Sequence, residues 1–285
     1  DQNYGFSKQE LRLCFDPAVN PAFKSSVKSG IENLIAQLEN KAIYEILQRE
    51  LEIDEKMMNS SNLISFLEIN PRDELQEIKP NSAQHNVPAW SLFAIFFIII
   101  PLSINIVQEK NQGTFVRLKT NPVSYASIMG SKVLVFLGVC VLQFILLLLV
   151  GIYLFPYLGL PAFKINGSYL LLFLVAIFSG LGAIGIGILL GTLAKTQEQS
   201  APFGATFVVI LAAVGGIWIP VFMMPEFMQF VAVLSPMNWG LNGFYDVIIR
   251  NGSFMDILPE LASLGVFFII MMILSVSVDK FKYRL

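Results

Sequence analysis

The chain has 285 residues, of which 55% are hydrophobic and only 14% are charged, with a formal net charge of −2. A soluble domain carries about 25% charged residues, so the composition argues against an ordinary soluble protein, and the charge argues against nucleic acid as a partner. Charge is also unevenly distributed, because residues 1–88 hold 9 of the 19 Lys/Arg and 14 of the 21 Asp/Glu. We therefore expect an acidic soluble domain at 1–88 and a membrane domain at 89–285.

The N-terminal domain is predicted to be mixed α/β. Residues 10–15 alternate polar and apolar side chains, as a strand does, and a second strand is expected at 63–69. Between them, residues 21–58 carry apolar residues at helical spacing. The polar, proline-flanked stretch 79–87 is expected to link this domain to the first membrane span.

Five later segments are apolar over about 20 residues, the length that a bilayer requires. They are residues 89–107, 132–155, 169–194, 202–222 and 258–278. Aromatic residues near their ends fit an interfacial belt. The fold class is therefore a polytopic α-helical membrane protein with five transmembrane helices in this sequence.

Lysine and arginine set the orientation, because they concentrate in cytoplasmic loops. One side carries eight of them, in the loop 108–132, near residue 195 and in the C-terminal tail, whereas the other side carries Lys164 and Arg250. We expect the eight-residue side to be cytoplasmic, with residues 1–88 outside. Translocating a polar domain of this size needs an upstream helix, so we expect a sixth span before residue 1. The outer loop 223–257 is semi-apolar and is expected to pack short helices into the outer membrane face.

Glycines at 180, 182 and 185 match the spacing of a dinucleotide-binding fingerprint, which needs a preceding strand. They lie inside an apolar span, together with Gly187 and Gly191, so close helix packing is the better interpretation. No phosphate-binding P-loop occurs in the sequence. The two cysteines, Cys14 and Cys140, predict neither a disulfide nor a metal site, and we expect no cofactor and no metal bound by this chain.

We expect no well-buried ionisable residue in the spans, which argues against an ion-driven carrier. Asn105 and Gln143 are the main amide side chains there. Hydrogen bonding between helices is one interpretation and a place on the substrate path is the other. Pro101 is expected to kink its span. His85, the one histidine, is expected at the surface.

Residues 108–124 predict a short charged elbow between two spans. Gly113 should end the first helix, Asn121 can cap the next one and Pro122 suits its first position. Glu109 and Arg117 are expected to be charged groups at the cytoplasmic surface. An ordinary loop with positive-inside charges explains the same pattern.

This pattern resembles the ABC type-2 exporter permeases, the membrane subunits of ATP-binding-cassette exporters. The matching positions near the elbow are Glu109, Gly113, Thr114, Arg117, Leu118, Pro122, Ser124, Gly130 and Lys132. The approach to the first span, from Asn81 through His85 to Trp90, is similar to the multidrug branch. Leu234, Pro236 and Trp239 resemble the final external loop of that family.

The resemblance implies a permease without its own ATP site, paired with a second copy or a close relative in a bacterial inner membrane. A cytoplasmic ATPase subunit would bind ATP and magnesium and dock on the elbow. Glu109, Gly113, Arg117 and Pro122 would couple the ATPase to the permease, and Asn105 and Gln143 could line the substrate path. The exported substrate could be a drug, lipid, glycan or peptide.

Two rival interpretations stay open at this point. A secondary carrier would need buried ionisable groups. A membrane-anchored external binding or sensor protein would not need five spans punctuated by glycine and proline.

Overall fold

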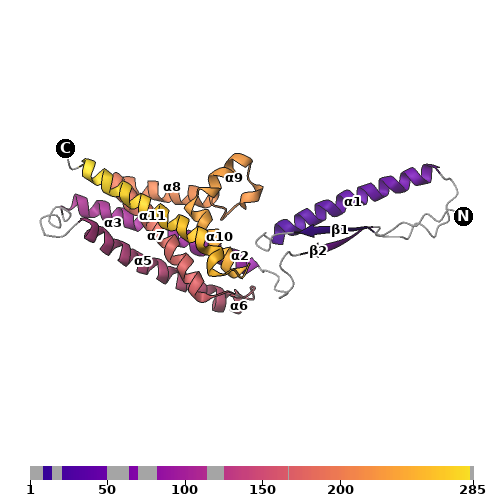
Figure 1. Ribbon diagram of the computed structural model, residues 1–285, viewed down its shortest axis with the longest axis horizontal. Coiled ribbons are helices and arrows are strands. Elements are labelled where there is room, and N and C mark those ends of the chain that lie inside the picture. The colour runs from indigo at the N-terminus through magenta and orange to yellow at the C-terminus, as the bar shows by residue number, and fades with distance from the viewer. Residues whose placement is uncertain are drawn as a thin grey trace. The chain divides into compact units, whose positions relative to one another are not determined.

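The computed structural model describes residues 9–14, 21–49, 64–69, 82–113, 125–165 and 167–282. It divides into two compact units, Asp1–Pro80 and Asn81–Leu285 (Figure 1). The unit boundary falls inside the segment expected to be a linker, and helix begins again at Ser82.

The first unit contains strand β1 (Gln9–Cys14), helix α1 (Pro21–Arg49) and strand β2 (Ile64–Ile69). The two strands pair in parallel, with Gln9 opposite Ile64 and Cys14 opposite Ile69. Parallel neighbours need a crossover connection, which α1 helps to provide. Each strand lies within one residue of its expected position.

The second unit begins with helix α2 (Ser82–Phe96) and helix α3 (Ile99–Asn111), separated by a turn. The break lies one helical turn before Pro101. A proline ring clashes with the carbonyl four residues earlier and has no N–H to offer it, and that carbonyl belongs to Phe97. Residues 82–88 are already helical, so the described part of the expected linker belongs to the first apolar helix.

A second long helix and the central helix follow. Helix α5 (Tyr125–Leu149) passes through a π-helical turn, η2 (Val150–Leu154), into the short α6 (Phe155–Tyr157). Helix α7 covers Tyr169–Leu193, and helix α8 covers Gln197–Val214. The chain then forms a 3-10 turn, η3 (Val221–Met223), and helices α9 (Glu226–Val233), α10 (Pro236–Ile248) and α11 (Phe254–Lys282).

Four helical stretches of the described chain are long and apolar enough to cross a membrane: Ser82–Asn111, Ser127–Tyr157, Tyr169–Leu193 and Phe254–Phe281. The chain is therefore a polytopic helical membrane protein. The fifth expected span, 202–222, is not among them. Its helix, α8, starts with the polar residues Gln197–Ser200 and ends at Val214, because Gly215 and Gly216 follow and Gly216 has φ +93°.

Helix α7 lies at the centre of the bundle. Of its apolar stretch 67% is buried, against 17% for the α5 and α11 stretches. Its glycines let three neighbours approach. A Cβ on Gly180 would lie 3.2 Å from Cys140 of α5, one on Gly185 would lie 3.0 Å from Met271 of α11, and one on Gly191 would lie 2.8 Å from Ile106 of α3. The glycine pattern thus serves helix packing, as the sequence indicated.

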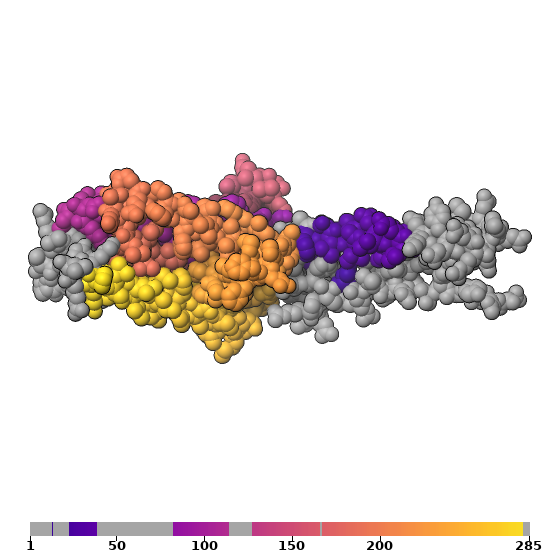
Figure 2. Space-filling model, turned by 90° about the horizontal axis from the view of Figure 1, so that it is seen from above, coloured from indigo at the N-terminus to yellow at the C-terminus, as the bar shows by residue number. Residues whose placement is uncertain are grey.

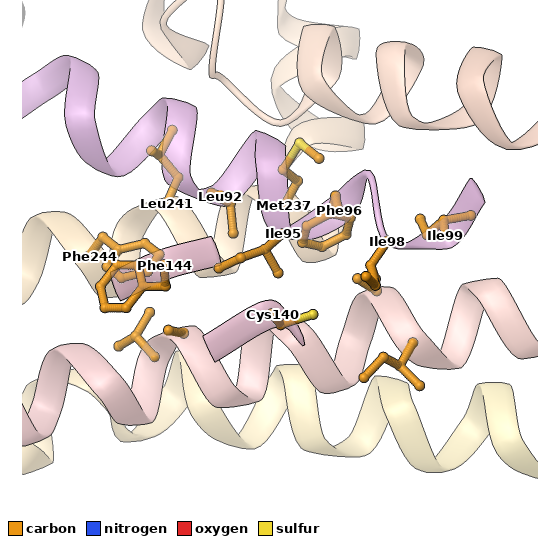
Figure 3. Packing of buried hydrophobic residues seen from close by; sticks show 14 of the residues in the cluster. Leu92, Ile95, Phe96, Ile98, Ile99, Cys140, Phe144, Met237, Leu241 and Phe244 are labelled. Carbon is orange, nitrogen blue, oxygen red and sulfur yellow. The ribbon is translucent and has the colours of Figure 1, made fainter. Parts of the chain in front are cut away.

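Helix α10 closes the other half of the core. Most of its residues are buried, and it packs on α2, α7 and α11. Figure 3 shows its Met237, Leu241 and Phe244 beside residues of α2 and α5. The rings of Phe144 and Phe244 stack with centroids 5.3 Å apart. The loop expected at the outer face does form short helices, but α10 lies within the bundle rather than on its surface.

Long apolar faces remain on the outside. Figure 2 shows α8 and α9 in orange and α11 in yellow at the surface. Their large exposed side chains include Phe203, Phe207 and Ile210 of α8, Phe227 and Phe230 of α9, and Ile269 and Ile273 of α11. Apolar surface of this extent fits contact with lipid or with another apolar partner.

Candidate functional site

The end of α3 is the start of the predicted elbow. Helix α3 ends at Asn111, and Gly113 follows with φ +70°, a backbone conformation that glycine adopts without steric cost. The predicted break between span and elbow is therefore present. Arg117 and Pro122, two of the four predicted coupling residues, lie outside the described residues.

A lysine from α5 reaches the end of α3. Lys132 Nζ lies 2.5 Å from Glu109 Oε1 and donates to Asn105 Oδ1 at 2.8 Å. Asn105 and Glu109 are four residues apart and so share one face of α3. The Lys132 side chain is 10% exposed and that of Glu109 is 25% exposed. Lys132 thus contacts two predicted site residues, Asn105 of the proposed substrate path and Glu109 of the proposed coupling site.

These contacts correct two expectations. Glu109 is not a free surface charge, because it is half-buried and paired. The expectation of no buried ionisable residue in the spans is also wrong for Lys132, the first residue of the expected span 132–155, and buried Asp279 lies one residue beyond the last expected span. The helices extend beyond the apolar runs on which the prediction relied, so their charged ends lie inside the folded bundle.

Further polar contacts surround the end of α3. Lys110 Nζ donates to the carbonyl oxygens of Gly191 and Thr192 at 3.1 and 3.2 Å. These carbonyls belong to the last turn of α7, where a cation also complements the helix dipole. Ser200 Oγ of α8 donates to Ser103 Oγ of α3 at 2.8 Å.

Helix α11 is joined to the same end of the bundle through α7. The hydroxyls of Thr192 and Ser275 lie 2.9 Å apart. Figure 1 shows the C-terminal ends of α3 and α11 at one end of the bundle. Polar links at this end therefore connect α3 to α5, α7 and α8, and α7 to α11.

Gln143 lies elsewhere. It is 11 residues beyond Lys132 on α5, about 16 Å further along the helix axis. Its Oε1 is buried without a hydrogen-bond partner, whereas the oxygen of Asn105 accepts a bond from Lys132. The structure therefore does not bring the two predicted path residues together.

The opposite half of the bundle holds His85, which is buried rather than at the surface. Its ring meets that of Tyr245 edge-on, with centroids 5.6 Å apart. Burial raises the pKa of Tyr245 to about 12, because an apolar environment disfavours the phenolate. These two aromatic side chains join the start of α2 to α10.

The segment that resembles the family's final external loop begins α10. Ser235 precedes the helix, Pro236 occupies its first turn and the Trp239 indole donates to the Val233 carbonyl at 2.7 Å. Near the other end of α10, Asp246 forms an ion pair of 2.6 Å with Arg250, which lies two residues beyond the helix. The residues of this short motif thus form the turn that begins α10.

Lys132 was missed as a site residue by reasoning from the sequence. The available signal was a lysine next to a long apolar run, 23 residues after Glu109 and across the elbow from it. The cluster has no nucleophile or acid–base pair arranged for chemistry, and within the described residues no group of three or more His, Cys, Asp or Glu could hold a metal. What it can do is hold helix ends together.

Known proteins match this chain over most of its length. The family model for the ABC-2 family transporter protein matches residues 15–277. A linearmycin resistance permease protein of Bacillus subtilis (strain 168), LnrN, is 32% identical over 170 residues, 58% of this chain and 42% of the relative.

Two further relatives are named as transport permeases. The probable multidrug ABC transporter permease YbhR of Escherichia coli (strain K12) is 26% identical over 213 residues, 66% of this chain and 56% of the relative. The putative transport permease YvfS of Bacillus subtilis (strain 168) is 27% identical over 175 residues, 59% of this chain and 66% of the relative. The matches thus span less than two thirds of each relative, whereas the family model covers nearly the whole chain. The chain belongs to the ABC-2 family of transporter proteins.

Proposed function

We propose that this chain is the membrane-spanning permease subunit of an ATP-driven exporter that works with a separate ATPase subunit. The observation that carries the proposal is the family match over residues 15–277. Two relatives are named for linearmycin resistance and multidrug transport. Among the drug, lipid, glycan and peptide substrates considered, we therefore favour an antibiotic-like drug.

The buried charge at Lys132 changes how the rivals are weighed. A secondary carrier was disfavoured because the spans were expected to lack buried ionisable groups, and that reason no longer holds. Membership of the ABC-2 family is now the argument against a secondary carrier, and it is also the argument against a membrane-anchored external sensor.

The proposed orientation places residues 1–88 outside the membrane and the end of α11 in the cytoplasm. Its support is that Lys110, Lys132, Lys195 and Lys280 belong to helix ends or loops at the end of the bundle where α3 and α11 finish (Figure 1). Lys164 lies instead beside Gln84 at the start of α2, and an excess of lysine at one end is the asymmetry of a cytoplasmic face. The membrane would be a bacterial cytoplasmic membrane.

In this assignment the elbow 108–124 receives the ATPase, which alone binds ATP and magnesium. Glu109, Gly113, Arg117 and Pro122 keep their proposed coupling role. Gln143 is the stronger candidate for the substrate path, since Lys132 already engages Asn105. A second permease copy or a close relative would complete the pore, with lipid on the remaining apolar faces.

The test is purification of the full-length protein together with the P-loop ATPase encoded beside it. A stable complex that hydrolyses ATP in lipid nanodiscs, and loses hydrolysis when the P-loop lysine of the ATPase is replaced, supports the proposal. A permease that never binds an ATPase when the two are co-expressed would refute it.

A further inference from the structure

The two ends of the elbow are joined by one side chain. Helix α3 ends at Asn111, and helix resumes at Tyr125. Glu109 lies one turn before the exit and Lys132 lies two turns after the return. Their ion pair therefore closes the base of the elbow, with Asn105 as the second acceptor for the lysine.

The link between the ends of α3 and α5 is polar. Helix α5 packs along α2 and α7, and α3 packs along α7 and α8. Close approach between α3 and α5 in the described chain is therefore limited, and Lys132 supplies the hydrogen bonds and the ion pair between them. Further along the bundle, α5 packs on α7 and on α2, which continues into α3.

The burial of the link makes it durable. An exposed ion pair exchanges readily with water and contributes little, whereas Lys132 is 10% exposed. The second oxygen of Glu109, Oε2, is buried and has no hydrogen-bond partner. Losing either charge would leave the other in a largely dry site, so the pair resists separation.

We propose that Lys132 is a positioning residue that fastens α3 to α5 across the base of the elbow, so that displacement of the elbow moves both helices as one body. The inference rests on the proposed function, because an ATPase docked on the elbow would supply that displacement. The expected consequence is that ATP binding shifts α3 and α5 without changing the separation of their ends.

The experiment uses the full-length permease with its ATPase in nanodiscs. Spin labels at the exposed positions Gln108 and Ser131, in a cysteine-free background, report the separation of the two helix ends by dipolar broadening of the continuous-wave spectrum. Spectra are recorded without nucleotide and with ATP plus vanadate. ATP hydrolysis in the same samples shows whether the ATPase is bound and active.

Four sequences are compared: the parent, Lys132→Met, the neutral pair Lys132→Met with Glu109→Gln, and the charge swap Lys132→Glu with Glu109→Lys. We expect the parent and the swap to keep the same broadening in both nucleotide states. Lys132→Met should lose broadening when ATP and vanadate are added. The neutral pair leaves no buried unpaired charge, so it provides the uncoupled state if the single variant does not fold.

Each result decides the matter. Unchanged broadening in both Lys132 variants overturns the inference, even where ATP hydrolysis shows that the proposed function stands, since Lys132 would then be structural only. If no ATPase binds, the proposed function fails. The inference, which rests on it, then fails as well, whereas ATP hydrolysis with unchanged broadening overturns the inference alone.

Discussion

The close approach of α3 and α7 can be tested with a single methyl group. In Gly191→Ala the new Cβ would lie 2.8 Å from Ile106 Cβ and 3.0 Å from the Ser103 carbonyl oxygen. Neither atom is at the free end of a flexible side chain, so the clash cannot be relieved by a rotamer change. Overpacking of this kind costs about 1–3 kcal/mol.

Matched controls separate this cost from helix propensity. Gly130 and Gly138 of α5 have open space where a Cβ would lie. Alanine is favoured over glycine in a helix by about 1 kcal/mol, and this gain is common to all three sites. The difference between Gly191→Ala and Gly138→Ala therefore isolates the contact, and we expect Gly191→Ala to be less stable by about 1–3 kcal/mol.

The measurement is thermal unfolding in detergent followed by circular dichroism. A change of 1 kcal/mol corresponds to roughly 2–4 °C in the melting temperature of a chain of this size. Gly187→Ala should fall between the two, because its Cβ would first meet the flexible end of Leu102 at 2.9 Å. If Gly191→Ala and Gly138→Ala have the same melting temperature, then α3 and α7 are not in close contact and the packing argument is wrong.

Three further predictions follow from the ion pair, the buried tyrosine and the topology. Lys132→Met should lower the free energy of unfolding by about 1–3 kcal/mol, because half-buried Glu109 loses its partner, and adding Glu109→Gln should recover much of it; equal melting temperatures would contradict this. Tyr245 should titrate near pH 12 in the folded protein. Because the pKa is raised in the folded state, the contribution of Tyr245 to stability is full below pH 10 and is lost as the pH rises through about 12. The difference in phenolate absorbance between the parent and Tyr245→Phe measures this pKa, and an ordinary tyrosine value would contradict the prediction. A cysteine at position 285 should not react with an impermeant reagent in intact cells, whereas one at position 28 should. The reverse labelling pattern would show that the orientation is opposite to the one proposed.

Local features of the fold could be predicted from the sequence. A run of about 20 apolar residues indicates a membrane helix wherever it lies, which located four spans. Pro101 indicated a break because proline acts on the carbonyl four residues earlier. The α7 glycines indicated close packing because they lie in an unbroken apolar helix. In each case the cause and the effect lie within one element.

Features that join distant elements were not predictable in this way. The pairing of Glu109 with Lys132 depends on how α3 and α5 are placed by α7, and neither residue alone specifies a partner. The burial of α10 depends on the helices around it, since its mixture of apolar residues and glycine suits an interface as well as a core. The length of α8 was overestimated because apolar residues continue past the two glycines that end the helix.

The links at the end of α3 differ in strength, and the difference suggests which helices can separate. Gly187 and Gly191 hold α7 against α3 by close packing that water cannot replace. The α5 link is a largely buried ion pair, whose rupture leaves an unpaired charge. By contrast, the Ser103–Ser200 bond to α8 joins neutral hydroxyls, and such a bond contributes about 0.5–1.5 kcal/mol because water can take its place. A force applied at the elbow would therefore break this hydrogen bond to α8 before the ion pair to α5, and only the packing of α3 along α8 would then hold that helix.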